Sequence, residues 1–353
     1  MKIFNCTHCG QLLYFENSHC EQCGYKLGFQ AQNLQLLPLV DQANGLLSIY
    51  QNDSGLYSYC VNHEYGICNW LVPSDSSTPY CKACELNRTI PNISKPEYFK
   101  RWKVIENAKH RLIYSLLRMR LPVISKDVEE ETGLSFDFVA DEDLDSEEKI
   151  LTGHDNGLIT LNIAEADDIE REMTRKAMDE VYRTVLGHFR HEVGHYYWDR
   201  LIDGTDYLEE FRTLFGDERQ DYGEALEEHY KQGPPAGWNL EFISSYATTH
   251  PWEDWAESWA HYLHIIDTLE TAYAFGLSVH TGVSKQAVSL DANITDDPYR
   301  LENFDNIINL WLPFTFAMNS VNRSMGQPDL YPFVIRPKVI EKMRFIHKVC
   351  YHA

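Results

Sequence analysis

The stretch YRTVLGHFRHEVGHYYWDRL, residues 182–201 of a 353-residue chain, carries the most informative pattern in the sequence. We expect a helix from about Asp179 to Leu201, because apolar and aromatic residues recur there at helical spacing. His191 and His195 are four residues apart, so both imidazoles project from one face of this helix, one turn from each other. Two ring nitrogens so placed can bind one tetrahedral zinc ion, and the pattern therefore predicts a zinc site.

Glu192 follows the first of these histidines on an adjacent part of the same helix face. It could reach a zinc-bound water without binding the metal, and it would accept a proton as hydroxide attacks a carbonyl carbon. Gly194 is small where the helix must pass close to another element. We expect His188, one turn before His191, to be a packed or hydrogen-bonding group rather than a ligand. The alternative interpretation is a chance His-Glu-x-x-His pattern.

A catalytic zinc site needs a third protein ligand besides the two histidines. The metzincin pattern would place a histidine six residues after His195, but Leu201 stands there. A second helix, expected over about Trp252–Leu269, supplies Glu253 and Glu257 one turn apart. One of them could bind zinc while the other accepts the N–H of a ligating histidine, and the residues alone do not rank the two. Because this helix is unusually apolar, buried carboxylates on it need a partner such as a metal.

The arrangement of Tyr246, Glu253 and Glu257 resembles the glutamate helix of gluzincins of the anthrax lethal factor type. This resemblance implies that Glu253 is the zinc ligand and that Glu257 lies behind a ligating histidine. It also implies that Tyr246 stabilises the oxyanion of the reaction.

Most of the chain is similar to zinc-binding metallopeptidases that carry an N-terminal zinc-ribbon segment. The similarity implies an α+β fold. Residues 1–95 are rich in cysteine and turn residues, and Ile90–Pro96 resembles a linker, so we predict a zinc-ribbon region over residues 1–95 and a zincin-like metallopeptidase domain over 96–353. The similarity also implies that the strand expected over Gly157–Ile163 is an edge strand that binds the substrate backbone by strand addition, through Gly157, Leu158, Ile159 and Thr160. The matching stretches, besides residues 182–201, are TGHDNGLITLNIAEAD (152–167), FGDER (215–219), HPWEDWAESWAHYLH (250–264) and NRSMGQPDLYPF (322–333).

Eight of the nine cysteines form two groups in the first 95 residues. Cys6, Cys9, Cys20 and Cys23 make a CxxC–x10–CxxC pattern, which predicts a structural zinc with no open coordination position. Cys60, Cys68, Cys81 and Cys84 form a second candidate site, although only the last two make a CxxC pair. His63 could replace Cys60 or Cys68 there. Cys350 is left over, and we expect it to be an unpaired thiol.

The formal net charge of the chain is −22, of which residues 1–95 hold only −2. Such an acidic catalytic part argues against nucleic acid and anionic membranes as partners. The sequence begins with metal-type cysteines rather than a signal peptide, and no apolar run is long enough for a membrane span, so we expect a cytoplasmic protein. The zinc ribbons could recruit a protein partner, or their zinc ions could serve only to stabilise a small fold. The nearly neutral charge of this region makes nucleic acid the weaker alternative as a partner.

Further elements complete the expected fold. We predict a helix over Glu97–Leu121, a strand over Phe136–Val139, a solvated acidic loop over Asp141–Glu148 and a last helix over Val339–Val349. Three other histidines lie near the proposed site in the sequence. We expect structural or surface roles for His261 and His264, and for His250 either substrate binding or an ordinary hydrogen bond.

The function that this sequence predicts is peptide-bond hydrolysis by a zinc-activated water, with Glu192 as general base. It implies one catalytic zinc ion, one or two structural ones, and a peptide or protein substrate. Two alternatives stay open at this point: a non-catalytic scaffold that depends on zinc, and a zinc hydrolase that acts on a non-peptide amide.

Overall fold

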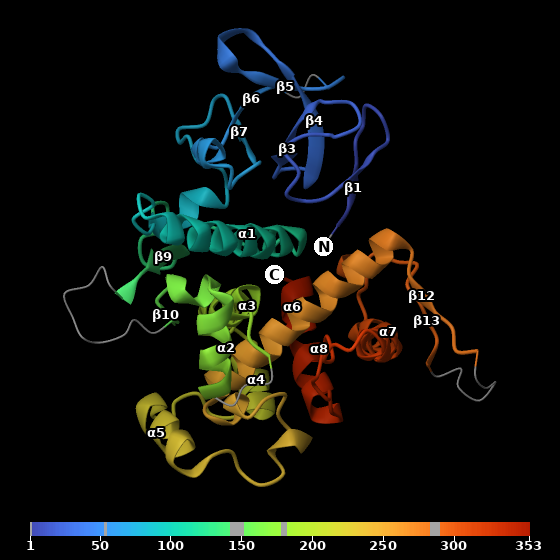
Figure 1. Ribbon diagram of the computed structural model, residues 1–353. Coiled ribbons are helices and arrows are strands. Elements are labelled where there is room, and N and C mark those ends of the chain that lie inside the picture. The colour runs from blue at the N-terminus through green and yellow to red at the C-terminus, as the bar shows by residue number, and fades with distance from the viewer. Residues whose placement is uncertain (1, 53–54, 142–151, 178–181, 283–289) are drawn as a thin grey trace. The chain divides into compact units, whose positions relative to one another are not determined.

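The computed structural model of the chain describes residues 2–52, 55–141, 152–177, 182–282 and 290–353 (Figure 1). Packing divides the chain into two compact units, Met1–Thr174 and Arg175–Ala353. This division differs from the domain boundary predicted after residue 95, which stays a prediction. The acidic loop expected over residues 141–148 lies almost wholly outside the described residues, as do residues 179–181 at the start of the expected helix. Residues 182–184 are described and are not helical, so the helix begins later than predicted.

The first unit begins with a Cys-rich region built from short antiparallel strands. Five strands pair in chain order into one sheet, because alternate side chains of neighbouring strands share a small apolar core of Leu39, Leu47, Ile49, Tyr57 and Leu71. A two-stranded hairpin precedes this sheet. The strands are β1 (Phe4–Asn5), β2 (Leu12–Leu13), β3 (Lys26–Gln30), β4 (Gln35–Asp41), β5 (Leu47–Ile49), β6 (Leu56–Tyr59) and β7 (Leu71–Pro73).

The remainder of the first unit is the long helix α1 (Pro96–Arg118) and a four-stranded sheet. The buried Lys109 of α1 lies 5.8 Å and 5.4 Å from the ring centres of Phe136 and Phe138 on β9, so the helix packs against this sheet. The predicted helix and both predicted strands of this region are confirmed to within a few residues. The sheet has the order β10-β11-β9-β8, and its elements and those that follow are β8 (Asn87–Thr89), β9 (Ser135–Val139), β10 (Gly153–Asp155), β11 (Leu158–Asn162), η5 (Ile163–Ala166) and α2 (Asp168–Ala177).

The edge-strand prediction for Gly157, Leu158, Ile159 and Thr160 is wrong. Strand β11 pairs in parallel with β9 on one side and antiparallel with β10 on the other. Leu158, Ile159 and Thr160 each have a partner in both neighbours, and Gly157 lies in the turn between β10 and β11 with a φ of +82°. Since strand addition needs unpaired backbone groups, these residues offer no free edge to a substrate.

The second unit is mainly helical, and its core is the contact of α3 with α6. Trp255, Trp259 and Tyr197 are fully buried at this contact, with Tyr197 stacked on Trp259 at 5.1 Å. The helix α3 starts at Val185 because the Thr184 side chain caps it, accepting a hydrogen bond from the Gly187 amide. The elements are α3 (Val185–Leu201), α4 (Leu208–Phe215), α5 (Tyr222–Gln232), η6 (Trp238–Leu240), η7 (Tyr246–Thr248), α6 (Pro251–Phe275), β12 (Ser278–Val279), β13 (Ala292–Asn293), η9 (Pro298–Arg300), α7 (Phe304–Ser324) and α8 (Pro337–Tyr351).

The chain is therefore of the α+β class, as the sequence predicts. The helices α6 and α8 are confirmed, each longer than expected, and α7 was not predicted. None of the helices in the described ranges is long and apolar enough to cross a membrane.

Gly194 marks the closest approach of α3 and α6. A β-carbon at this position would lie 3.0 Å from the Cα atom of Ala256 and 3.3 Å from the Cβ atom of Trp259. The Nε1 atom of Trp255 also donates a hydrogen bond to the Gly194 carbonyl, at 2.8 Å. A side chain at this residue would force α3 or α6 to shift by a few tenths of an ångström, so glycine suits this close approach best.

We expect Gly194→Ala to lower the free energy of unfolding by about 1–3 kcal/mol, because the added methyl group overpacks the α3–α6 contact. Chemical denaturation of the two proteins measures this difference. Gly223→Ala is the matched control, since Gly223 is an exposed helical glycine of α5, and this variant should be neutral or slightly more stable. Equal stability of Gly194→Ala and wild type would contradict the proposed close approach.

Candidate metal centre

Three acceptor atoms converge where α3 meets α6. The Nε2 atom of His191 lies 3.0 Å from Oε2 of Glu253 and 3.3 Å from Nε2 of His195. The same Glu253 oxygen lies 3.6 Å from Nε2 of His195. The four-residue spacing on α3 presents both rings to one side, and Glu253 reaches them from the first turn of α6. The structure thus brings together the three residues that the sequence predicts as ligands.

The chemistry of this donor set fits a zinc ion. Two ligands that bind zinc tetrahedrally at about 2.0–2.1 Å lie about 3.3 Å from each other, which is close to the separations observed here. Glu253 is only 2% exposed, and its Oε2 atom has no hydrogen-bond partner among the described residues. A buried carboxylate oxygen that faces two imidazole nitrogens needs a cation between them.

Glu257 lies behind His191 as the resemblance implies. Its Oε1 atom is 2.8 Å from Nδ1 of His191, so the carboxylate accepts the Nδ1 proton and leaves Nε2 with a lone pair toward the metal position.

Asp199, one turn after His195 on α3, is a carboxylate that no sequence motif indicates. Burial raises the pKa of Asp199 to about 6, and the nearby charge of His195 lowers it.

Glu192 and Tyr246 flank the three ligand atoms. Glu192 is 9% exposed on α3, and burial raises the pKa of its carboxyl group. Tyr246 on η7 has its ring centre 6.0 Å from that of His191. Burial raises the pKa of the Tyr246 hydroxyl strongly, so this group keeps its proton at neutral pH. A buried proton acceptor and a partly buried proton donor therefore lie beside the candidate metal position.

The cysteines of the first unit gather into two clusters of four. In each cluster the four sulfur atoms lie within 4.8 Å of one another. The Sγ atom of Cys6 is 3.7 Å from that of Cys23, and Cys9 is 3.5 Å from Cys20. Four thiolates bound tetrahedrally at about 2.3 Å lie about 3.8 Å apart, so the geometry fits zinc.

The second cluster consists of Cys60, Cys68, Cys81 and Cys84, all of them buried. The alternative ligand His63 does not belong to it; its Nδ1 atom donates to the carbonyl of Cys68 at 2.7 Å. His63 thus supports the loop that carries a ligand. Cys350, far from both clusters in the sequence, is a free buried thiol whose pKa is raised by burial.

Comparison with known protein families supports both the metal centre of the second unit and the zinc-ribbon character of the cysteine clusters. Residues 98–349 match the family described as "Putative zinc-binding metallo-peptidase". The chain belongs to this family. Residues 3–95 match a zinc-ribbon domain. The chain is also similar to uncharacterized proteins of Mycobacterium bovis and Mycobacterium tuberculosis, each 46% identical over 352 residues, which cover 99% of this chain and 95% of the relative. No solved structure matches.

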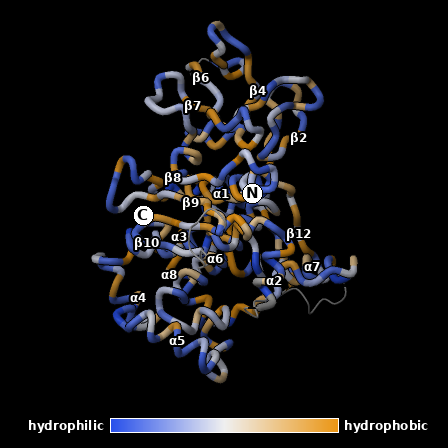
Figure 2. The backbone as a smooth tube through the Cα atoms, turned by 60° about the vertical axis from the view of Figure 1, so that its left-hand side comes forward, coloured by the Kyte–Doolittle hydropathy of each residue, from blue (hydrophilic) through white to orange (hydrophobic). Residues whose placement is uncertain are grey.

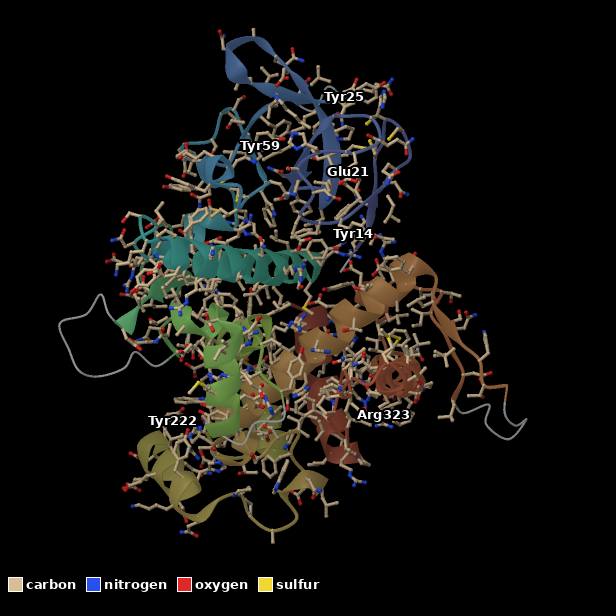
Figure 3. All side chains as sticks on the ribbon, in the orientation of Figure 1. Tyr14, Glu21, Tyr25, Tyr59, Tyr222 and Arg323 are labelled. Atoms are coloured by element: carbon tan, nitrogen blue, oxygen red, sulfur yellow. The ribbon has the colours of Figure 1, made fainter. Side chains whose placement is uncertain are left out.

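This family member has one further residue at the candidate site that no sequence pattern indicates. Tyr222, at the start of α5 (Figure 3), donates a hydrogen bond from its hydroxyl to Oε1 of Glu253 at 2.8 Å. That is the oxygen of Glu253 turned away from the two histidines. Tyr222 therefore holds Glu253 so that a single oxygen faces the metal position.

We expect Tyr222→Phe to weaken zinc binding at this site by about tenfold, because groups that orient metal ligands typically contribute this much or more. Competition with a chromophoric chelator measures the affinity, and the relevant site is the one that His191→Ala removes. Tyr230→Phe, which changes an exposed tyrosine of the same helix, is the matched control and should leave the affinity unchanged. An unchanged affinity in Tyr222→Phe would contradict the role of this hydroxyl.

The other histidines of this region have structural contacts. His250 caps α6, since its Nδ1 atom accepts from the Trp252 amide at 3.2 Å and its Nε2 atom donates to the Gln220 carbonyl at 3.2 Å. His261 shares a hydrogen bond of 2.8 Å with the hydroxyl of Tyr331. His188, His261 and His264 are not among the clustered ligand atoms of the described residues. Both ring nitrogens of His250 are engaged, which favours the ordinary hydrogen-bonding role for it.

Proposed function

We propose that this metallo-peptidase family member hydrolyses peptide bonds with zinc held by His191, His195 and Glu253. One observation supports this proposal most: three acceptor atoms from two helices lie 3.0–3.6 Å from one another, and the next residue after His191 is a buried carboxyl group. When bound there, zinc would polarise the scissile carbonyl group and acidify a water molecule.

Glu192 is the proposed general base and then the general acid. It takes a proton from the attacking water and gives it to the nitrogen of the leaving amine. Burial raises the pKa of Glu192, and a carboxyl group with a raised pKa exchanges protons more readily near neutral pH. Its partner in the reaction is Tyr246, whose protonated hydroxyl can donate a hydrogen bond to the oxygen on which negative charge develops.

We further propose that the full chain binds three zinc ions, one at the peptidase site and one at each cysteine cluster. Elemental analysis of the purified chain should give about three zinc atoms per molecule. His191→Ala should give about two, because the remaining histidine and Glu253 are too few for a stable site. A count of two in wild type that does not change in His191→Ala would favour the alternative of a non-catalytic scaffold.

Screening of a random peptide library against the zinc-loaded full chain tests the reaction itself. We expect internal peptide bonds to be cleaved, and we expect a strong chelator to stop the cleavage. A protein that carries three zinc ions but cleaves no peptide would contradict the proposal and direct the search to non-peptide amides.

The proposed compartment is the cytoplasm. All nine cysteines are free, and eight of them form two metal-type clusters, which are typical of a reducing environment. The proposed substrate is a peptide or protein, and the nearly neutral zinc-ribbon region is the proposed contact for a protein partner.

A further inference from the structure

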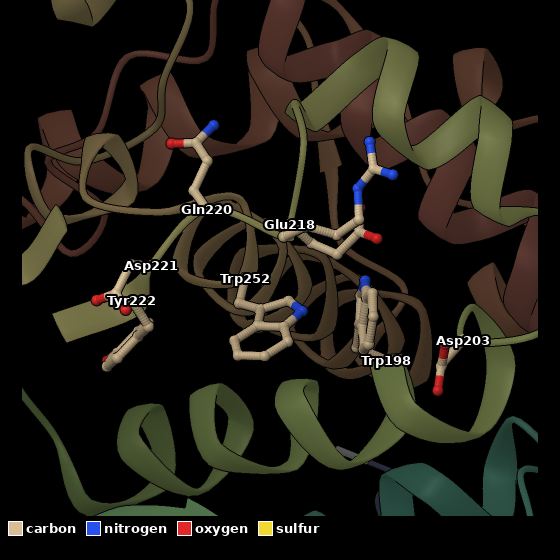
Figure 4. Close-up of a pocket in the computed structure, with 8 residues that line it drawn as sticks. Trp198, Asp203, Glu218, Gln220, Asp221, Tyr222 and Trp252 are labelled. Atoms are coloured by element: carbon tan, nitrogen blue, oxygen red, sulfur yellow. The ribbon is translucent and has the colours of Figure 1, made fainter. Parts of the chain in front are cut away.

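A pocket of about 520 Å³ opens beside the candidate metal centre in the second unit (Figure 4). Tyr222 belongs to both places, since it lines the pocket and its hydroxyl binds Glu253. Trp252 lines the pocket and directly precedes Glu253, and Trp198 lines it three residues after His195 on α3. Three residues of a helix span about 4.5 Å along its axis. A substrate bound at the metal position would therefore have a neighbouring side chain within reach of this pocket.

One wall of the pocket is aromatic. The indole rings of Trp198 and Trp252 meet at an angle of 66° with their centres 5.5 Å apart. The ring of Tyr222 lies 6.3 Å from that of Trp252. The faces of such electron-rich rings attract cations as well as apolar groups, and tryptophan does so most strongly.

Four charged residues line the same pocket, and two of them are already neutralised. The guanidinium of Arg219 binds both carboxylate oxygens of Asp217, each at 2.8 Å. Glu218 accepts hydrogen bonds from Arg212, one of them at 3.0 Å from Nε. These pairs contribute little net charge to the pocket.

The other two charged residues are Asp203 and Asp221, which have no cationic partner within 4 Å among the residues that the structure describes. The Asp221 carboxylate caps α5 by accepting a hydrogen bond from the Glu224 amide at 2.8 Å, and this bond leaves its negative charge in place. The pocket thus combines electron-rich rings with two uncompensated negative charges.

We propose that this pocket binds the cationic side chain of a lysine or arginine in the peptide substrate. The inference rests on the proposed peptidase function for the identity of the ligand as a peptide. An acidic side chain would be repelled by Asp203 and Asp221, and a purely apolar one would gain nothing from them. A cation gains from both the rings and the carboxylates.

Binding to the zinc-loaded full chain with Glu192→Gln tests the pocket without any need for turnover. The probes are two pools of synthetic nonapeptides, random except for a central lysine in one pool and a central norleucine in the other. Norleucine has the chain of lysine without the ammonium group. We expect the lysine pool to bind about tenfold more tightly, measured by calorimetry and by the change in tryptophan fluorescence.

Two charge-removing substitutions in the same protein link the preference to the pocket. Asp203→Asn and Asp221→Asn should each reduce the preference for lysine by about threefold or more, and asparagine at position 221 still caps α5. Asp206→Asn removes the same charge from the same loop as Asp203→Asn but outside the pocket lining, so it should leave the preference unchanged. Equal binding of the two pools would overturn the proposal.

Cleavage by the wild-type chain separates this inference from the proposed function. If both pools are cleaved at the same rate, the peptidase function stands and the pocket proposal is wrong. If neither pool is cleaved but the lysine pool binds selectively through Asp203 and Asp221, the pocket proposal stands and the peptidase function is wrong.

Discussion

Replacing Glu192 by glutamine should lower kcat for peptide hydrolysis by about 10²–10⁴-fold, since glutamine has the shape of glutamate but accepts no proton. The zinc content should stay the same, because Glu192 is not one of the three clustered ligand residues. The effect should appear in kcat rather than KM, since the group acts on the reacting atoms and contributes little to substrate binding. Steady-state kinetics on a peptide from the library screen, with zinc analysis of the same preparation, measures both quantities.

Glu228→Gln is the matched control for this substitution. It makes the same chemical change at an exposed residue of α5 that does not belong to the ligand cluster. We expect wild-type kinetics from it. Wild-type proteolysis by Glu192→Gln would show that the proton is transferred by another group, and the proposed mechanism would then be wrong.

Replacing Lys342 by methionine should lower the free energy of unfolding by about 3–5 kcal/mol. Lys342 on α8 is buried and lies 2.6 Å from a carboxylate oxygen of Asp254, which is fully buried next to Glu253 on α6. Its Nζ atom also donates to the carbonyl of Glu241 at 2.8 Å. Without the lysine, the buried Asp254 must either carry an uncompensated charge or keep a proton that the unfolded chain releases, and both cost stability. Denaturant unfolding of the two proteins measures the difference.

The loss of stability in Lys342→Met should increase as the pH rises. Burial raises the pKa of Asp254 to about 7, although Lys342 lowers it. In Lys342→Met this pKa rises further, so the native state keeps a proton that the unfolded chain has already lost. The deficit relative to wild type should therefore grow as the pH rises above 7, by up to about 1.4 kcal/mol per pH unit.

Two further variants make this result specific. Lys338→Met removes a half-exposed ion pair with Glu341 on the same helix and should cost no more than about 1 kcal/mol. Asp254→Asn combined with Lys342→Met should recover part of the stability, because no buried charge is then left alone. A loss in Lys342→Met as small as that in Lys338→Met would contradict the structural role of the buried pair.

The sequence predicts the parts of the site that local geometry determines. His191 and His195 need only the period of one helix, and the structure places their Nε2 atoms 3.3 Å apart. Glu253 and Glu257 could not be ranked from spacing, because both lie on one helix face; a family resemblance ranked them. The first cysteine cluster likewise follows from two CxxC pairs, whereas the second has only one such pair and its other two ligands were less certain from spacing.

The remaining features depend on tertiary contacts that leave no periodic signal. Tyr222 contacts Glu253, which is 31 positions further along the chain, and nothing in its local sequence distinguishes it from the other tyrosines. The edge-strand prediction for β11 failed because a short strand, β10, folds back on it through a turn at Gly157. A residue pattern shows that a segment is extended, but it does not show how many neighbours the segment has.

Tyr222 lies on α5, which has the least buried surface of the helices at the candidate site. No residue of α5 is buried, and Figure 2 draws this helix mostly in the blue of hydrophilic residues. Helices with so little buried surface open locally at small cost in free energy, far below that of global unfolding. Amide hydrogens of α5 should therefore exchange with deuterium much sooner than those of α3 and α6. We therefore expect the hydrogen bond from Tyr222 to Glu253 to break and re-form many times before α3 or α6, which carry the three metal ligands, opens once.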